Sequence, residues 1–175
     1  MKRLIKNKVT KFLRKGLSEK ELKLISYLEL NKKYFFEIKD IKQFFKGDNE
    51  RRVYIYRLKK KARIIKLNKT KYFLIPIRAT KGNWSEHPFI IIDEIMNGKD
   101  YCIVGKAAAN YWGIIDQIPL TYEVWNTKKH KEVKIFNSAI NFKKNKKENF
   151  PKSQIKDIYN HKFIIANKDE SKKWK

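Results

Sequence analysis

The 175-residue sequence predicts an α+β protein with a helical domain that ends in a β-hairpin, followed by a small α/β domain. Apolar residues recur at helical spacing as far as residue 62, and two β-rich runs then follow at 63–67 and 72–77. From residue 89 onward, short helical and extended patterns alternate. The domain bounds we expect are 1–77 for the first domain, 78–88 for a polar linker and 89–175 for the second domain.

Two segments near the start of the chain have the pattern of helices. Residues 3–14 place apolar side chains among Lys and Arg, which predicts a short basic amphipathic helix. Ser18 and Glu21 then form an S-x-x-E capping pattern, which predicts the start of a longer helix that ends at Asn31.

Two more helices are predicted before the hairpin. The apolar residues within 34–45 are spaced for a short helix, which Gly47 closes. Asp48 or Asn49 can then cap a third helix that runs to about Ala62. Three helices followed by a hairpin is the order of a winged helix-turn-helix domain, so we expect that fold for the first domain.

The third helix separates into two faces when its residues are placed at about 100° intervals. The inward face is mostly apolar and comprises Arg51, Tyr54, Ile55, Leu58, Ala62 and Ile65. The opposite face combines an amide, guanidinium groups and apolar groups, which is the chemistry that base edges in a DNA major groove accept. This outer face comprises Asn49, Arg52, Val53, Tyr56, Lys60 and Arg63, with Arg57 and Lys59 at its edges.

The hairpin is expected to supply a second basic element beside this helix. Lys66, Lys69 and Lys71 lie on or near its polar tip and can contact the DNA backbone as a wing. Val53 and Tyr56 are not polar, so their place on the outer face favours contact over simple solvation. A solvated basic face on a small core helix is the alternative. We predict that this helix and hairpin bind duplex DNA.

The charge distribution also indicates a polyanionic partner. The chain has a net charge of +25, concentrated towards its two ends. Residues 1–77 carry 24 Lys and Arg against 7 Asp and Glu, and residues 126–175 carry 15 against 5, while residues 78–125 carry 4 against 6. Nucleic acid is the usual partner of such a chain and an anionic membrane surface a rarer one. A general RNA- or nucleoid-binding protein, with the Lys-rich run 128–147 as its main surface, is therefore an open alternative.

The second domain is predicted from short segments. Residues 89–96 have the pattern of an apolar helix, and residues 100–114 that of an extended segment leading into a helix of small residues. Residues 120–126 alternate as a strand does, and residues 132–145 can form two more strands. Trp112 and Trp125 are expected in the core of this domain.

No catalytic or metal site is predicted. His87, His130 and His161 lie far apart in the sequence, with no Cys or carboxylate at metal-ligand spacing. The chain has no glycine-rich nucleotide-binding motif. The acidic residues of the middle segment leave a metal-dependent nuclease as a less favoured alternative; they are Asp93, Glu94, Asp100, Asp116 and Glu123. We expect a protein that is not an enzyme and needs no cofactor.

Three features bear on the compartment. Cys102 is the only cysteine, so no internal disulfide can form, and we expect it to be a buried small hydrophobe. No apolar run approaches the ~18–20 residues that span a bilayer. The first residues have no apolar signal-peptide segment or cleavage site. These features predict a soluble cytoplasmic protein.

One stretch of the second domain resembles a known family. "DYCIVGKAAANYWGIIDQIP" followed by "TYEVWNTKK" is similar to the AbiEi-type antitoxins of type IV toxin–antitoxin (abortive infection) systems. In that family a winged helix precedes a small-residue helix, an aromatic-Gly pair and a -QIP- turn that leads into a strand. The matching residues here are Ala107, Ala108, Ala109, Tyr111, Trp112, Gly113, Gln117, Ile118, Pro119 and the strand through Val124.

The resemblance extends over roughly residues 18–170. Arg57-Leu58 and Tyr72 lie in a run that resembles the family's recognition helix and wing, and Glu170 matches a common glutamate. Many members have a glycine where this chain has Lys61-Ala62. Members usually continue into a further helical region, so we expect either a shortened stand-alone member or one whose C-terminal part is missing.

The resemblance implies a prokaryotic repressor and antitoxin. Its first domain would bind repeats in its own promoter, and its second would oppose a toxin that resembles a nucleotidyltransferase, without necessarily binding it. A DNA regulator of an unrelated operon, with the second domain serving for dimerisation or effector binding, is a further alternative.

Overall fold

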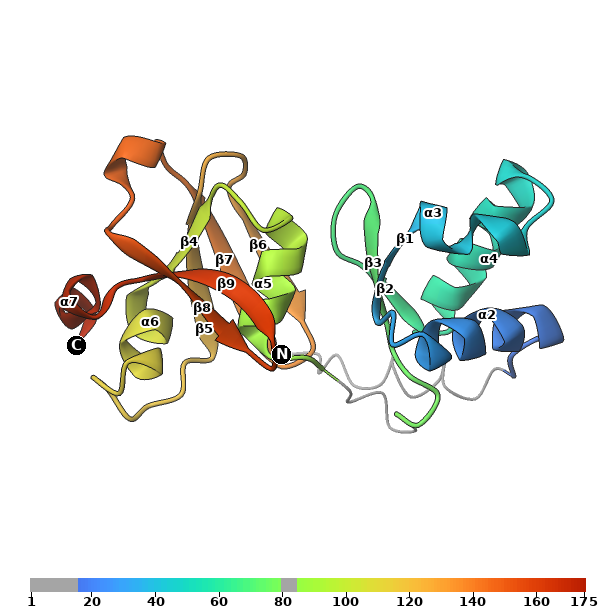
Figure 1. Cartoon of the computed structure of the whole chain (residues 1–175), viewed down its shortest axis with the longest axis horizontal. Helices are drawn as coiled ribbons and strands as arrows, with labels where there is room; N and C mark the ends of the chain where they lie inside the picture. Colours follow the sequence, from blue (N-terminus) through green and yellow to red (C-terminus); the bar gives the residue numbers. More distant parts are fainter. Residues whose placement is uncertain (1–15, 80–84) are drawn as a thin grey trace, which may run out of the picture. The chain divides into compact units, whose positions relative to one another are not determined.

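A computed structural model describes residues 16–79 and 85–175 of the chain (Figure 1). The predicted helix at 3–14 lies outside the described residues. The chain divides into two compact units between Ser85 and Glu86, a boundary within the range predicted as a linker. Each unit combines helices with a β-sheet, so the mixed α+β class is confirmed.

Within residues 16–79, unit 1 contains four helical segments and a small antiparallel sheet (Figure 1). Its elements are α2 (Glu19–Leu30), β1 (Phe35–Glu37), α3 (Ile38–Ile41), the 3₁₀ helix η1 (Lys42–Phe44), α4 (Asp48–Lys60), β2 (Ile64–Lys66) and β3 (Lys71–Leu74). The order of strands in the sheet is β1-β3-β2. The predicted hairpin is confirmed as β2–β3, with Ile64 opposite Leu74.

The short helix predicted within 34–45 is confirmed only for its later part, as α3 and η1. Its first part is the strand β1, where Phe35 pairs with Phe73 and Phe36 with Tyr72 of β3. Phe36 is thereby almost fully buried. The helical spacing of apolar residues favoured a helix over this segment. Residues 35–37 form a strand instead, because they pair with β3, more than 30 residues away in the sequence.

The ends of α4 also differ from the prediction. Gly47, in extended backbone, is the N-cap residue, and neither Asp48 nor Asn49 caps the helix. Asp48 instead lies in the first turn, where its Oδ1 accepts a hydrogen bond from Arg51 Nη1 at 2.7 Å. The helix ends at Lys60, because Ala62 adopts a left-handed backbone with φ of 52°.

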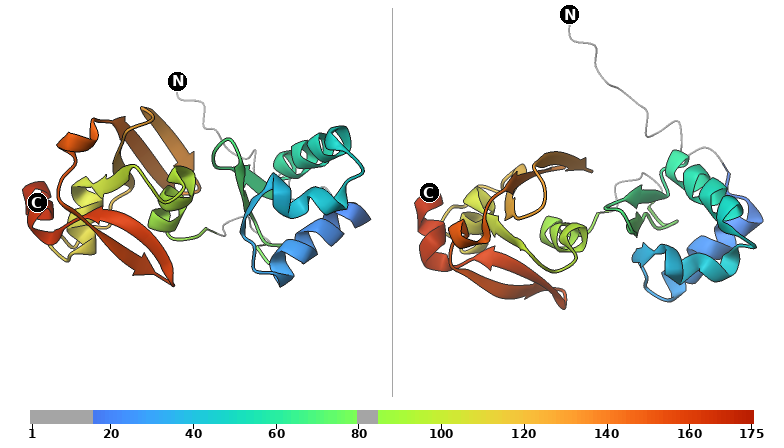
Figure 2. Two further views of the ribbon diagram at one scale, coloured as in Figure 1. Left: turned by 45° about the horizontal axis from the view of Figure 1, so that its top comes forward. Right: turned by 90° about the horizontal axis from the view of Figure 1, so that it is seen from above.

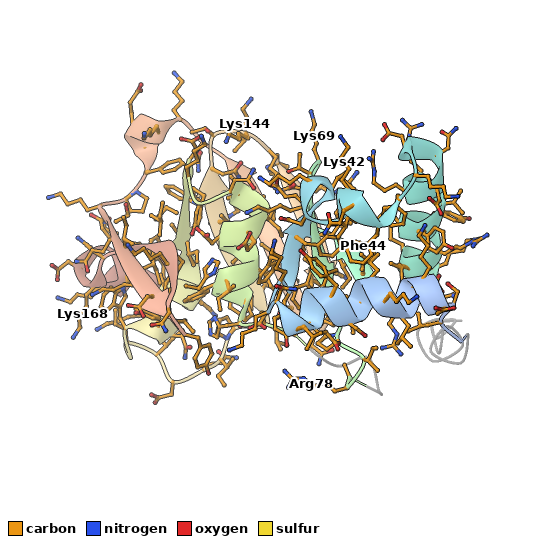
Figure 3. All side chains as sticks on the ribbon, turned by 45° about the vertical axis from the view of Figure 1, so that its right-hand side comes forward. Lys42, Phe44, Lys69, Arg78, Lys144 and Lys168 are labelled. Atoms are coloured by element: carbon orange, nitrogen blue, oxygen red, sulfur yellow. The ribbon has the colours of Figure 1, made fainter. Side chains whose placement is uncertain are left out.

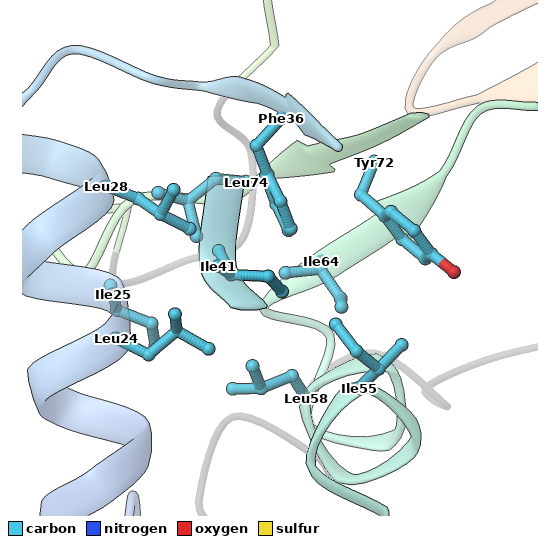
Figure 4. Close-up of a cluster of buried hydrophobic side chains, with 10 residues drawn as sticks. All are labelled: Leu24, Ile25, Leu28, Phe36, Ile41, Ile55, Leu58, Ile64, Tyr72 and Leu74. Atoms are coloured by element: carbon cyan, nitrogen blue, oxygen red, sulfur yellow. The ribbon is translucent and has the colours of Figure 1, made fainter. Parts of the chain in front are cut away.

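The core of unit 1 draws on every element except η1 (Figure 4). It comprises Leu24, Ile25, Leu28, Phe36, Ile41, Ile55, Leu58, Ile64, Tyr72 and Leu74. Burying such side chains contributes roughly 1.5–3 kcal/mol each, which is what fixes the hairpin and α4 against α2.

Unit 2 is built on one six-stranded mixed sheet (Figure 2). Its elements are α5 (Pro88–Met96), β4 (Tyr101–Val104), α6 (Gly105–Tyr111), β5 (Thr121–Asn126), β6 (Lys131–Ile135), β7 (Ser138–Lys144), η2 (Lys147–Asn149), β8 (Ser153–Ile158), β9 (His161–Ala166), α7 (Lys168–Ser171) and η3 (Lys172–Trp174). The strand order is β6-β7-β5-β4-β9-β8, with β5–β7 and β4–β9 parallel.

Most of the predicted elements of unit 2 are confirmed, from α5 to β7. The hairpin β8–β9 was not predicted, although β9 supplies buried residues such as Phe163 and Ile165. Trp112 and Trp125 are only half-buried, so their assignment to the core was wrong. Trp112 Nε1 donates to the carbonyl oxygen of Ala166 at 2.8 Å, and Trp125 Nε1 donates to Glu123 Oε1 at 2.9 Å.

Across the described ranges, none of the helices combines the length and apolar character that crossing a membrane requires.

Candidate nucleic-acid interface

The first turn of α2 is held by the predicted capping box. Ser18 N donates to Glu21 Oε2 at 2.7 Å, and Glu21 N donates to Ser18 Oγ at 3.3 Å. Both bonds satisfy amides that would otherwise have no partner at the start of the helix. The prediction of a helix start at this position is confirmed.

Lys61 joins the end of α4 to this helix start. Its Nζ lies 2.5 Å from Glu21 Oε2 and 2.9 Å from the carbonyl oxygen of Gly16. The Glu21 side chain is only 1% exposed. Burial raises its pKa, but hydrogen bonds from Lys61 and Ser18 outweigh burial and hold the pKa below its ordinary value. An ionised Glu21 therefore orients α4 on α2.

The residues predicted for the inward face of α4 that lie within the helix are buried or half-buried. Ile55 and Leu58 are buried, and Arg51 and Tyr54 are half-buried. The Arg57 guanidinium lies 5.5 Å from the centre of the Tyr54 ring, and Lys20 Nζ lies 5.4 Å from it. The Tyr54 ring therefore lies close to two cations at the border of the two faces.

The outer face of α4 is exposed, as predicted for its helical residues. Val53 is 45% exposed and Tyr56 55%, so both side chains are accessible to a partner. Lys60 Nζ lies 4.6 Å from the centre of the Tyr56 ring. The exposed side chains of this face are Asn49, Arg52, Val53, Tyr56, Arg57, Lys59 and Lys60, and we call this set the outer face.

The cations of the outer face are not neutralised within the described part of the chain. The two acidic residues of α4 have other partners: Asp48 pairs with Arg51, and Glu50 pairs with Lys20 of α2 and accepts from Lys46 N. Among residues 16–79 and 85–175, no carboxylate pairs with Arg52, Arg57, Lys59 or Lys60. The outer face can therefore meet a polyanion without first breaking ion pairs of its own.

Arg63 does not belong to the outer face, which corrects the prediction. It lies beyond α4, after the left-handed Ala62, and is half-buried. Its Nη1 donates to the carbonyl oxygen of Pro76 at 3.3 Å, and its own carbonyl accepts from Ile75 N at 2.8 Å. Arg63 connects the end of α4 to the strand side of unit 1.

The tip of the hairpin is organised by Asn68. Its Oδ1 accepts from Thr70 N at 2.9 Å, Lys71 N at 2.9 Å and Thr70 Oγ1 at 3.3 Å. Lys66 and Lys69 are exposed, whereas Lys71 is half-buried at the start of β3, opposite Glu37. The tip therefore presents Lys66 and Lys69 most openly.

Sequence reasoning did not single out the cations between α3 and α4. Lys42 and Lys46 are both exposed in this connection. The side chains of Lys42 and Lys69 extend into solvent (Figure 3). The signal that could have identified Lys42 and Lys46 is their position in the chain immediately before α4, the helix that carries the outer face.

Unit 2 brings together titratable groups that are distant in the sequence. His161 Nε2 lies 3.0 Å from Asp93 Oδ2 and 3.9 Å from Glu94 Oε1. Tyr101 Oη donates to Asp93 Oδ1 at 2.8 Å and accepts from Ile164 N at 2.9 Å. Burial raises the pKa of the Tyr101 phenol, so it stays protonated. The group ties α5 to β4 and β9.

The surroundings of Cys102 and of the acidic residues of unit 2 bear on the alternative of a metal-dependent nuclease. Cys102 is fully buried, as predicted, and burial raises the pKa of its thiol to about 12. Within the ranges that the structure covers, no group of three His, Cys, Asp or Glu side chains is placed to hold a metal ion.

A scan against models of known protein families and a search of curated proteins found no match to this chain.

Proposed function

We propose that the protein is a sequence-specific duplex DNA-binding regulator in which unit 1 is a winged helix-turn-helix. In this proposal α3 and α4 form the helix-turn-helix, α4 enters the major groove, and the hairpin β2–β3 is the wing. The order of elements in unit 1, with a three-stranded sheet ending in the hairpin, supports the proposal. The observation that carries it is the outer face of α4, which is exposed, cationic and partly apolar without internal ion pairs.

The chemistry of the outer face suggests a division of roles. Arg52 can form a bidentate hydrogen bond with guanine, and Asn49 can do so with adenine. Val53 can contact a thymine methyl group. Lys59 and Lys60, nearer the end of the helix, suit phosphate oxygens, as do Lys66 and Lys69 on the hairpin.

The test is a fluorescence-anisotropy titration of the full chain with the duplex immediately upstream of its own gene. Scrambled duplex serves as competitor at ~150 mM salt, because salt sets the non-specific background. A preference of ~10³ or more for the upstream duplex is expected of a specific regulator. Equal binding to both duplexes would contradict the proposal, because charge alone would then account for the affinity.

We further propose that the regulator is an autorepressing antitoxin of a type IV toxin–antitoxin system. The support for this step is the resemblance of residues 100–129 to AbiEi-type antitoxins. A cognate toxin would resemble a nucleotidyltransferase and be encoded beside this gene. Co-expression with the neighbouring gene tests the step: growth should stop when the neighbour is expressed alone and recover when both are expressed.

A further inference from the structure

Three segments of unit 2 meet at one end of the sheet: the chain leaves β5 and β7 there and enters β4 there. β5 and β7 are parallel neighbours with Asn126 opposite Lys144, so the loops that follow them start side by side. β4 runs antiparallel to β5 with Tyr101 opposite Asn126, so Asp100 lies at this edge as well. Residues from three separate segments are therefore brought together at this end of the sheet.

Buried Asn126 fixes the two loops relative to each other. Its side chain is fully buried, and its Nδ2 donates to the carbonyl oxygens of Lys129 at 2.9 Å and Lys143 at 3.2 Å. Its Oδ1 accepts from Lys128 N at 3.0 Å and Lys129 N at 2.7 Å. Its backbone carbonyl also accepts from Asn145 N at 2.8 Å. The loops are therefore held in place before any ligand arrives.

A pocket of about 450 Å³ lies between these loops, lined by Thr127, Lys144, Asn145, Lys146 and Asn149. We call it the loop pocket. In the part of the chain that the structure describes, the side chains of these five residues form no hydrogen bond or ion pair. Two ammonium groups, two amides and a hydroxyl are thus free to donate hydrogen bonds in one place.

The surroundings of the loop pocket are strongly cationic. Lys128 Nζ pairs with Asp100 Oδ2 at 3.1 Å. The hydrogen bond from Lys128 lowers the pKa of Asp100, and the charges of Lys128, Lys147 and Lys99 lower it further. Asp100 and Glu148 are the acidic residues of these segments, against six lysines at positions 99, 128, 129, 144, 146 and 147.

The composition of the loop pocket selects one ligand chemistry. Lysine ammonium groups bind phosphate as point charges, and amide and hydroxyl donors can complete the shell around several oxygens. No aromatic side chain lines the pocket, so it has no platform on which a base could stack. A ligand is therefore recognised through its phosphate.

We propose that the loop pocket is a phosphate-binding site, which takes the phosphate of a nucleic-acid backbone or of a free nucleotide. The site lies wholly in unit 2 and does not depend on the DNA-binding role proposed for unit 1. It adds a second anion-binding surface to the chain.

The experiment is a two-dimensional ¹⁵N NMR titration of the full chain, in which the side-chain NH₂ signals of Asn145 and Asn149 report directly on the pocket. Inorganic phosphate, a nucleoside monophosphate and a mixed-sequence single-stranded oligoribonucleotide are titrated separately. Saturable shifts of both amide signals are expected with at least one of them. Shifts with the two small anions identify a free phosphate ligand, and shifts with the oligonucleotide alone identify a backbone phosphate.

Charge-matched variants distinguish a phosphate-binding site in the loop pocket from non-specific electrostatic attraction of anions to the lysines. The double variant Lys144→Gln, Lys146→Gln is expected to raise the apparent Kd measured in the titration at least tenfold. The control Lys162→Gln, Lys168→Gln removes the same charge from exposed positions elsewhere on unit 2, where Figure 3 shows Lys168 well apart from Lys144, and should change it less than twofold. Unshifted Asn145 and Asn149 amides, or equal weakening by both double variants, would overturn the proposal.

Discussion

The side chains of α4 divide between a buried face and an exposed one, and Arg52 lies on the exposed one without an ion-pair partner in the described chain. A planar guanidinium in that position can read a guanine edge through two hydrogen bonds. The neighbouring Arg51 is half-buried and paired with Asp48, so two adjacent arginines have different roles.

Arg52→Ala is expected to lower the affinity for the specific duplex by ~1–3 kcal/mol and to relax the preference at one base pair. Anisotropy titrations against a set of single-base operator variants measure both effects. Lys23→Ala, which removes an exposed cation from α2, is the matched control and should leave the preference intact. An unchanged base preference in Arg52→Ala would show that α4 is oriented differently on DNA.

Ala62 occupies a backbone position that favours glycine. It follows the end of α4 with φ of 52°, where Ala62 N donates to the carbonyl of Lys59 and Arg63 N to that of Leu58. This pair of bonds is a Schellman motif, in which glycine is the usual residue. Adopting the left-handed conformation destabilises the folded state by about 1–2 kcal/mol for a residue with a Cβ atom. Replacing alanine with glycine destabilises the protein by about 0.4–1 kcal/mol, because glycine raises the conformational entropy of the unfolded chain.

Ala62→Gly is therefore expected to stabilise unit 1 by about 0.5–1 kcal/mol. Chemical denaturation followed by NMR signals of unit 1 measures the free energy of unfolding. Gly113→Ala is the converse control in unit 2: it has φ of 65° at the end of α6, and a Cβ there meets nothing within 4 Å. It should destabilise unit 2 by a similar amount, and a neutral Ala62→Gly would mean that the strain is absent.

At the scale of elements, α4 is held at its end by Lys61 and faces solvent along its outer face, while the hairpin adds exposed lysines. The sequence predicted the helix, its two faces and the hairpin, because period and turn residues are local signals. It did not predict β1, since that strand depends on pairing with β3 far along the chain. Arg63 was misplaced because helical geometry was extended past the actual end of α4.

Lys69→Ala tests the hairpin as an element that contacts the DNA backbone. It should weaken binding to specific and scrambled duplexes alike and reduce the slope of log K against log salt by about 0.9, the loss of one phosphate contact. Titrations at several salt concentrations give this slope. Thr70→Ala, at the same tip but uncharged, is the control, and a loss confined to the specific duplex would contradict a backbone role.

Lys61→Met tests the tie between α4 and α2. Removing the cation leaves buried Glu21 without its partner, and because Lys61 is partly exposed we expect a loss of about 2–3 kcal/mol at neutral pH. Denaturation of unit 1 measures the loss. Lys59→Met, at an exposed position, should change stability by less than about 0.5 kcal/mol.

The same pair predicts a pH dependence of unit 1. The pKa of Glu21 is lowered in the folded chain, so its stabilisation is complete above the ordinary value of 4.5 and is lost as the pH falls through the lowered pKa. Lys61→Met should remove this acid sensitivity. If the acid unfolding curves of the unmodified protein and of Lys61→Met run parallel, the acid sensitivity of unit 1 arises from other carboxylates.

At the scale of the whole molecule, the chain consists of two units that each place cations on a defined surface. The nearly neutral middle segment forms much of the core of unit 2, including α5 and β4, and the basic segments on either side of it carry the outer face and the loop pocket. The two surfaces can therefore be tested separately in the full chain.

Cys102 allows the opening of unit 2 to be followed in the intact protein. It is the only cysteine and is fully buried in β4, and burial holds its thiol pKa near 12. Labelling with a thiol reagent at pH 8 should be at least ~100-fold slower in the native chain than in denaturant, because only transiently opened molecules react. Rapid native labelling would show that β4 is not protected.

The sequence by itself determined the features that depend on neighbouring residues: the charge distribution, the capping box at Ser18, the two faces of α4 and the hairpin with its polar tip. Tertiary structure alone decided which strands pair, so it placed β1, β8 and β9, directed Arg63 to Pro76, and brought His161 to Asp93. It also gathered the loop pocket from segments that are separate in the chain. The physical reason is that helical period and turns arise from local hydrogen bonds, whereas strand pairing and convergent side chains arise from contacts between residues far apart in sequence.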